Sequence, residues 1–210
     1  MKLLVIGGTG KTGRELIKQG LAKGHFITAV VRNPKKIKFS HKNLNVIEGD
    51  VLIPASIEEA FQGQEAVLCA LGHKQFIIKT TILSRGTKNI IAGMAKNGVN
   101  RLICITSLGI NDSRFKLGLY YTLFTIPFIL FFYFLDKSKQ EKLIMNSTLE
   151  WTIVRPGQLT NGKKRTIYKH GSHVGHYILT KMISRADVAH FMLSLLNTRD
   201  YMNKTVGITY

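Results

Sequence analysis

The stretch "VIGGTGKTGRE", residues 5–15, decides the fold. Read from Gly10-Lys11-Thr12, it looks like the end of a P-loop, which requires another glycine five residues before Gly10 so that the backbone can wrap phosphates. That position is Val5, inside the apolar run "LLVI". The later strands that end in "LCALG" and "ICITS" lack the Asp that a P-loop protein uses for magnesium. We therefore reject a P-loop.

The glycine spacing favours a different phosphate-binding turn. Residues 2–6 are apolar and predict a strand, and Gly7, Gly10 and Gly13 follow at G-x-x-G-x-x-G spacing. The next residues, "RELIKQGLAKG", have helical periodicity. In a strand–turn–helix unit the free N–H groups of the helix N-terminus point at a pyrophosphate. The sequence therefore predicts a dinucleotide-binding turn.

Strand and helix patterns alternate along the whole chain of 210 residues. Such alternation predicts a parallel sheet with helices on both faces, and runs such as "AVLCAL" suit strands buried on both sides. We expect an α/β fold with a doubly wound parallel sheet (Rossmann fold), forming a single domain over residues 1–210. Strands are predicted at 2–6, 26–31, 44–48, 66–71, 101–106, 151–154 and 204–208, and helices near 12–23, 54–62, 79–97, 136–147 and 184–197.

The chain is strongly basic, with 30 Lys and Arg against 12 Asp and Glu and a net charge of +18. Such a charge suits nucleic acid, a membrane surface or acidic small molecules. The basic residues are scattered and no nucleic-acid-binding motif accompanies them. We therefore expect no specific nucleic-acid partner, and an anionic small-molecule substrate instead.

The positions of the cysteines and histidines indicate the expected cellular location and whether a metal site is expected. Cys69 and Cys104 fall in apolar runs, as free thiols do in a reducing cytoplasm, and no targeting segment is evident, so a cytoplasmic location is expected. His170, His173 and His176 lie three apart, but no cysteine or acid cluster completes a site. No metal site is predicted.

The end of the second predicted strand indicates which dinucleotide binds. NAD-binding proteins carry an acid there, about 20 residues after the glycines, for the ribose hydroxyls. This chain has Arg32, followed by Lys35 and Lys36. A guanidinium favours a 2′-phosphate through charge-assisted hydrogen bonds. We therefore expect NADPH rather than NADH as the cofactor.

The third predicted strand ends in "EGDV". Asp50 is placed to hydrogen-bond the adenine amino group, with Val51 contributing its backbone. An equally good interpretation is that Asp50 only forms a turn.

Candidate catalytic residues follow the fifth predicted strand. Ser107 lies after "ICIT", at the carboxyl edge of the sheet where the nicotinamide is expected. Tyr133 and Lys137 have Y-x-x-x-K spacing, which places them on one helix face. A lysine beside a tyrosine favours proton transfer from the phenol. Apolar packing of Tyr133 in "FFYFL" is the alternative, and Lys137 would then contact the nicotinamide ribose.

The motifs that follow one another in order and spacing resemble those of the atypical short-chain dehydrogenases of the NAD(P)H-binding, NmrA-like group. The stretches that carry the resemblance are "GGTGKTG", "VVRNP", "EGDV", "ALG", "ITSLGINDSR", "DKSKQEKLI", "LEWTIVRPGQLTNG" and "ISRADVAHFML". The resemblance covers nearly the whole chain. Within the group the chain looks most like the biliverdin-IXβ and NADPH-dependent flavin reductases.

The resemblance implies a set of cofactor contacts. Pro156, within "RPGQL", is implied to border the nicotinamide, whereas Lys137 and Gln158 stand where the flavin and biliverdin reductases have histidine. This departure favours a flavin over biliverdin, because a flavin can collect its proton from solvent. The implied contacts are Gly7, Thr9, Gly10, Lys11, Thr12, Gly13, Arg32, Asp50, Val51, Leu71, Gly72 and Ser107.

Residues 117–135, "LGLYYTLFTIPFILFFYFL", carry no charge. Their length would suit a membrane span, but a single crossing would separate two strands of one sheet, and Pro127 is expected to break the helix. We expect a lid-like segment over 115–135 that covers an aromatic substrate. A contact with an anionic membrane surface and a dimer interface are the alternatives, so a monomer and a homodimer both remain open.

The sequence thus predicts an NADPH-dependent reductase that transfers hydride to a planar aromatic acceptor, such as FMN, another flavin, a quinone or biliverdin. Catalysis would rest mainly on stacking two flat rings in a dry pocket. The alternative is a redox sensor of the NmrA type that binds NAD(P)H without turnover. A third reading, an epimerase-like short-chain enzyme, would require Tyr133 to face the nicotinamide.

Overall fold

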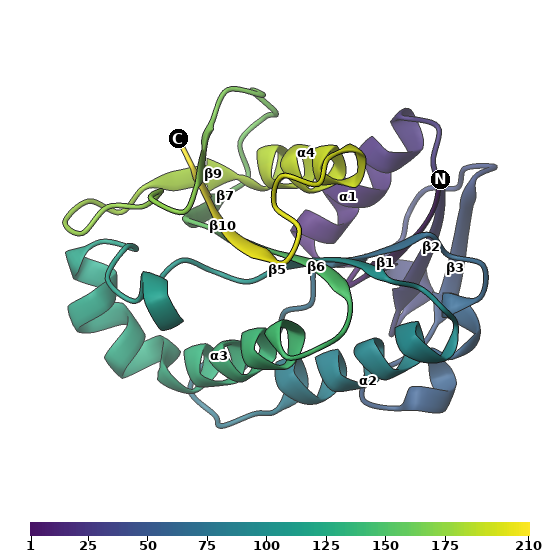
Figure 1. The fold of residues 1–210 in the computed structure, drawn as a ribbon, viewed down its shortest axis with the longest axis horizontal. Coiled ribbons are helices and arrows are strands. Elements are labelled where there is room, and N and C mark those ends of the chain that lie inside the picture. The colour runs from purple at the N-terminus through teal and green to yellow at the C-terminus, as the bar shows by residue number, and fades with distance from the viewer.

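The computed structural model describes residues 1–210 and shows one long sheet between two helical layers (Figure 1). The strand order is β3-β2-β1-β4-β5-β6-β10-β8, and every neighbouring pair is parallel except β10 and β8. The chain runs outward from β1 to β3 and then crosses back to β4, so strand order reverses beside β1. The predicted doubly wound Rossmann sheet is confirmed. Its strands are β1 (Lys2–Ile6), β2 (Phe26–Val31), β3 (Leu44–Glu48), β4 (Ala66–Cys69), β5 (Arg101–Ile105), β6 (Glu150–Pro156), β8 (Lys169–Gly171) and β10 (Lys204–Thr209).

Two helices cover each face of the sheet. Helices α1 (Lys11–Ala22) and α4 (Arg185–Ser194) pack on one face, and α2 (Ile82–Lys96) and α3 (Phe131–Met145) pack on the other (Figure 1). Side chains alternate along a strand, so Leu3 and Val5 join the core under α1 and α4, whereas Leu4 and Ile6 join the core over α2 and α3. Burial on both faces explains why the central strands are continuous apolar runs.

The helix predicted over 54–62 is absent, and this prediction was wrong. Two single 3₁₀ turns, Pro54–Ser56 and Glu59–Phe61, occupy the segment. Pro54 holds the preceding Ile53 in an extended conformation. The stretch before Gly63 is then too short to propagate an α-helix.

Residues 119–135 of the apolar segment are helical without interruption, contrary to the expected break at Pro127. Tyr121–Leu130 is wound as a π-helix and leads directly into α3, which begins at Phe131 instead of the predicted 136. A π turn is wider than an α turn and therefore leaves room for the ring of Pro127. Proline has no N–H for the i→i−4 hydrogen bond of an α-helix, and a π turn does not use that bond. No helix of the structure combines the length and the apolar character needed to cross a membrane.

The sequence analysis did not predict three short strands, each of three residues. β7 (Gln158–Thr160) and β9 (Met182–Ser184) form a separate small parallel sheet, and β8 adds an antiparallel edge to β10. His170 lies in β8, with its Nδ1 2.7 Å from the Tyr201 hydroxyl. The structure contains no group of three or more His, Cys, Asp or Glu side chains that could hold a metal ion.

Candidate functional site

The glycine turn joins β1 to α1 so tightly that two of its glycines are obligatory. Gly7 has φ +83°, and its carbonyl accepts a hydrogen bond of 3.0 Å from the Gly10 N–H. A Cβ on Gly13 would lie 2.2 Å from the Gly7 oxygen, and a Cβ on Gly7 would lie 2.5 Å from the Ala70 oxygen at the end of β4. The turn therefore packs the helix start against β1 and β4, at the point where strand order reverses.

The N-terminus of α1 is free to hold an anion. Its N-cap, Gly10, supplies no capping side chain, and no acid stands in its first turn. The N-terminus of α2 is different, because the Asp136 carboxylate accepts hydrogen bonds from the N–H groups of Leu83 and Ser84 at 2.8 and 3.1 Å. The open first turn of α1, with the exposed Lys11, fits a pyrophosphate. Thr9 lies half-buried in the turn, and Thr12 is buried in the first turn of the helix.

Cations flank this helix start on the side of β2. Arg32 is exposed directly after β2. The Asn33 side chain accepts from the Lys35 N–H and caps the short turn that follows, and the Arg14 guanidinium of α1 donates to the Lys36 carbonyl at 3.2 Å. These contacts hold the basic turn beside α1. A contact between Arg32 and a 2′-phosphate stays a prediction.

Val51 and Leu71 meet against α2. A Cβ on Gly86 would lie 2.7 Å from Val51 Cγ2 and 3.1 Å from Leu71 Cδ2. Two predicted cofactor contacts that lie twenty residues apart therefore share one apolar surface at the carboxyl edge. This surface is suited to the flat face of a base.

Asp50 serves as a turn residue in the structure. Its Oδ1 accepts from the Leu52 N–H at 2.9 Å, and the Val51 carbonyl accepts from Asn89 Nδ2 at 2.8 Å. The turn interpretation of Asp50 is therefore correct, and the adenine contact stays a prediction. A shallow cavity of about 260 Å³ adjoins this corner, lined by Leu52, Pro54, Arg85, Lys88 and Asn89.

A larger cavity, of about 400 Å³, lies at the opposite edge of the sheet. Its lining includes Lys2, Phe26 and Asn43, at the amino ends of β1, β2 and β3. In an open α/β sheet ligands bind at the carboxyl ends of the strands. The glycine turn, and not this cavity, therefore stays the predicted cofactor site.

Tyr133 and Lys137 share one face of α3, as their spacing predicts. The Lys137 ammonium lies 5.2 Å from the centre of the Tyr133 ring. The Tyr133 hydroxyl is 3.6 Å from the point that a Cβ on Gly72 would occupy, just beyond β4. Lys137 is 4% exposed and makes no hydrogen bond or ion pair in the structure, so its ammonium contacts the Tyr133 ring and keeps its hydrogen-bond donors unused.

Sequence reasoning missed His73, which follows Gly72 at this edge. Its ring centre is 4.8 Å from that of Tyr133, and its Nε2 lies 3.0 Å from the Thr80 hydroxyl. Burial lowers the pKa of His73, and the nearby Lys137 lowers it further, against an opposing effect of Asp136. A neutral imidazole near pH 7 can both donate and accept a proton. The sequence did offer one indication of His73 as a site residue, because it directly follows "ALG", the segment predicted at the carboxyl edge of the sheet.

Ser107 lies beyond β5 but is not joined to Tyr133. Its hydroxyl donates to the Leu108 carbonyl at 2.7 Å, and the Leu108 N–H donates to the Pro156 carbonyl at 3.0 Å. The turn that carries Ser107 is therefore fixed to the end of β6. Of the predicted catalytic group, the structure brings Tyr133 and Lys137 together and leaves Ser107 bonded to its own turn.

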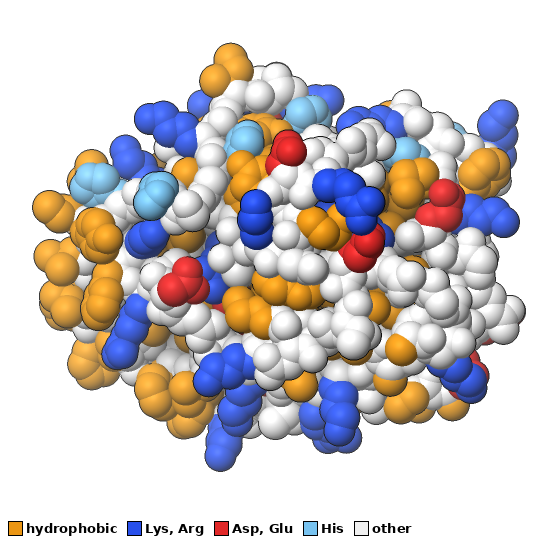
Figure 2. Space-filling view, in the orientation of Figure 1, with side chains coloured by type: hydrophobic (Ala, Val, Ile, Leu, Met, Phe, Trp, Pro, Cys, Tyr) orange, Lys and Arg blue, Asp and Glu red, His pale blue; other side chains and the backbone are white.

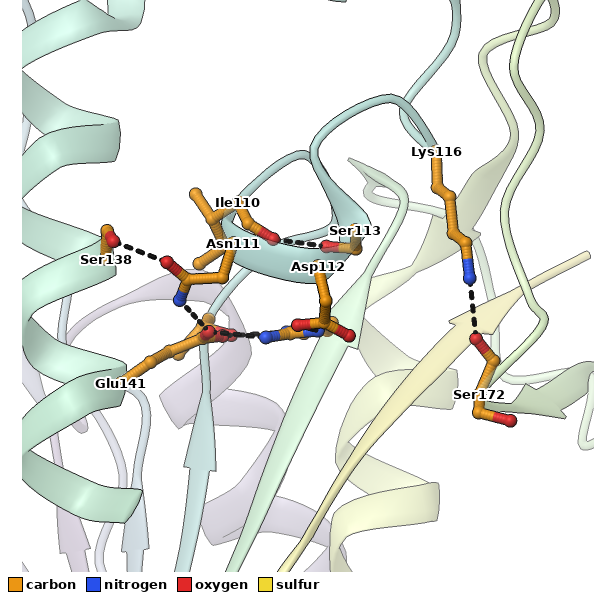
Figure 3. A network of polar contacts seen from close by, with 10 residues as sticks. Ile110, Asn111, Asp112, Ser113, Lys116, Ser138, Glu141 and Ser172 are labelled. Atoms are coloured by element: carbon orange, nitrogen blue, oxygen red, sulfur yellow. Dashed lines mark hydrogen bonds and ion pairs between the residues drawn. The ribbon is translucent and has the colours of Figure 1, made fainter. Parts of the chain in front are cut away.

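Glu141, also missed, organises a buried polar network behind this edge (Figure 3). Its carboxylate accepts from Thr106 Oγ1 at 2.6 Å, from Asn111 Nδ2 at 2.7 Å and from the Arg155 guanidinium at 2.9 and 2.6 Å. Arg155 also pairs with Asp112 at 2.7 Å. Burial lowers the pKa of Arg155, but the bonds to Glu141 and Asp112 raise it by more. The network ties β5, β6 and α3 to the loop after Ser107.

Residues 7–199 match the NAD(P)H-binding family, so this chain belongs to that family. An uncharacterized chloroplast protein of Arabidopsis thaliana is 31% identical over an alignment of 173 residues, and the match covers 76% of this chain and 60% of that protein. A solved Rossmann-fold NAD(P)-binding protein of Shigella flexneri is 26% identical with a TM-score of 0.75, and the match covers 99% of this chain and 92% of the other. The anaerobilin reductase ChuY of Escherichia coli O157:H7 has a TM-score of 0.82 at 20% identity, over 100% and 97% of the chains, and therefore shows likeness of fold. Membership of this family indicates a nicotinamide dinucleotide as the cofactor.

Proposed function

We propose that this protein is an NADPH-dependent reductase whose hydride acceptor is a planar aromatic molecule, such as FMN. The observation that carries the proposal is the grouping of Tyr133, Lys137 and His73 beside Gly72 at the carboxyl edge. In the NAD(P)H-binding fold this edge faces the nicotinamide. When bound, the cofactor supplies the hydride.

The chain's own residues bind, orient and exclude water. The open first turn of α1 holds the pyrophosphate, and Arg32 selects the 2′-phosphate. Lys137 contacts the Tyr133 ring but makes no hydrogen bond, and its ammonium would donate one to the nicotinamide ribose. Tyr133 and His73 are placed to supply a proton at the acceptor.

An aromatic acceptor is supported by the walls of this edge. Phe76 packs edge-on to Tyr133 with ring centres 5.4 Å apart, so aromatic side chains lie at the carboxyl edge where the acceptor would bind. The net charge of +18 favours an anionic acceptor through long-range attraction. A flavin phosphate meets both conditions.

The test is NADPH oxidation by the purified protein with FMN, run beside NADH. Arg32→Ala removes charge-assisted hydrogen bonds worth about 1.5–3 kcal/mol, so NADPH should lose about 10- to 100-fold in kcat/KM relative to NADH. Lys18→Ala, an exposed lysine farther along α1, is the matched control and should keep the wild-type preference.

Two results would contradict the proposal. An Arg32→Ala variant with the wild-type cofactor preference would remove Arg32 from the 2′-phosphate site. Tight NADPH binding without consumption on FMN, quinones or biliverdin would make the protein a redox sensor of the NmrA type instead of a reductase.

A further inference from the structure

Three segments expose large apolar side chains at one end of the molecule, on the left in Figure 2. They are the helical stretch 119–135, the loop before α2 and the loop before β9. Phe128 is 78% exposed and Ile77 is 74% exposed. A large group of exposed apolar side chains is uncommon on a soluble protein and marks an interaction surface. We name this the apolar end surface, and its members are Phe76, Ile77, Ile78, Leu119, Tyr120, Leu123, Phe124, Phe128, Ile129, Phe131, Leu135, Tyr177, Ile178 and Leu179.

The three segments are in contact with one another. The Leu119 N–H donates to the Ile178 carbonyl at 3.0 Å, which joins the helical stretch to the loop before β9. Phe76 packs on Tyr133 of α3, which joins the loop before α2 to the same helix. The segments that carry the exposed apolar side chains are therefore neighbours, and these side chains gather at one end of the molecule (Figure 2).

Basic residues flank this surface. No Asp or Glu lies between Glu65 and Asp112, between Asp112 and Asp136, or between Glu150 and Asp187, so all three segments belong to acid-free stretches. Asp112 itself is paired with Arg155. The cations adjoining the three segments in sequence are Lys74, Lys79, Arg114, Lys116 and Lys181.

We propose that the apolar end surface docks this protein on an anionic lipid bilayer. Aromatic and aliphatic side chains insert at the boundary between headgroups and acyl chains, and flanking cations bind the lipid phosphates. The helix lies along the bilayer and does not cross it, because β5 before it and β6 after it are neighbours in one sheet. A dimer formed through this surface is less favourable, because the flanking lysines and arginines of two copies of the chain would face and repel each other. This inference is independent of the reductase activity.

Vesicle flotation tests the proposal. Vesicles of phosphatidylcholine alone are compared with vesicles that contain about 30% phosphatidylglycerol, at about 0.05 and about 0.5 M salt. We expect the protein to float with the anionic vesicles at low salt, and to float less at high salt or with neutral vesicles.

Matched variants separate the apolar contribution from the charge. Phe124→Ser with Phe128→Ser should lower vesicle binding about tenfold or more. Phe26→Ser, at the start of β2 and 55% exposed against 56% for Phe124, should leave it unchanged. Equal thermal unfolding midpoints would show that the variants fold.

The charge variants give a second, independent readout. Lys74→Glu with Lys79→Glu should weaken binding to anionic vesicles, whereas Lys18→Glu on α1 should weaken it less. Failure of the wild-type protein to float, or equal binding by all variants, would overturn the proposal. So would a concentration-dependent dimer that the Phe124 and Phe128 substitutions dissociate, because the surface would then join two copies.

Discussion

Replacing Glu141 by Gln tests the buried network that supports the site. The Glu141 carboxylate is fully buried and accepts four hydrogen bonds, two of them from the Arg155 guanidinium. Glu141→Gln keeps the shape but leaves the buried Arg155 with Asp112 as its only anionic partner, and the Asp112 side chain is 71% exposed. Removing one partner of a buried ion pair costs about 3–5 kcal/mol. At about 2–4 °C for each kcal/mol in a chain of this size, Tm should fall by roughly 10 °C.

Urea unfolding followed by circular dichroism measures this loss. The matched control is Glu150→Gln in the exposed pair with Arg199, where the side chains are 45% and 79% exposed and the expected loss is below about 1 kcal/mol. The double variant Glu141→Leu with Arg155→Met removes both charges and should be more stable than Glu141→Gln alone. Equal losses in Glu141→Gln and Glu150→Gln would refute the reasoning.

Two further predictions concern the glycine turn and the start of α4. Gly13→Ala would place a Cβ 2.2 Å from the Gly7 oxygen, so it should weaken NADPH binding by more than about tenfold in calorimetry, while Gly162→Ala, with no contact nearer than 3.5 Å, should not. Burial raises the pKa of Asp187, but hydrogen bonds from the Tyr210 hydroxyl and others outweigh it and hold that pKa below its usual value. Such a carboxylate contributes stability above its unfolded pKa of about 3.9 and loses it as the pH falls through the folded pKa. Asp187→Asn should therefore destabilise the protein at neutral pH, and urea unfolding should show the gap to wild type closing below about pH 4; a gap that stays constant with pH would contradict this.

The first three strands could be predicted to the residue. β1, β2 and β3 have the predicted bounds, because apolar runs bounded by glycine and polar residues are a local signal. β7 and β9 could not be predicted, since each has only three residues and exists through its pairing with the other, more than twenty residues away. The π-helical winding at Pro127 also depends on its surroundings, because local rules predict a break there.

The candidate site divides in the same way. The glycine turn, Arg32 and the Tyr133–Lys137 face could be read from spacing, because each lies within one element or one turn. Glu141 carries no such signal. Its partners Thr106 and Arg155 lie 35 and 14 residues away and meet it only where β5, β6 and α3 pack together.

The sequence by itself determined the sheet, the dinucleotide turn and the class of cofactor, because periodicity and glycine spacing are short-range properties of the backbone. The tertiary structure alone decided that His73 lies against Tyr133 and that the loops before α2 and β9 join the helix 119–135 in one apolar surface. Each of these depends on side chains from distant segments, and their contact follows from how the elements pack and not from any local pattern.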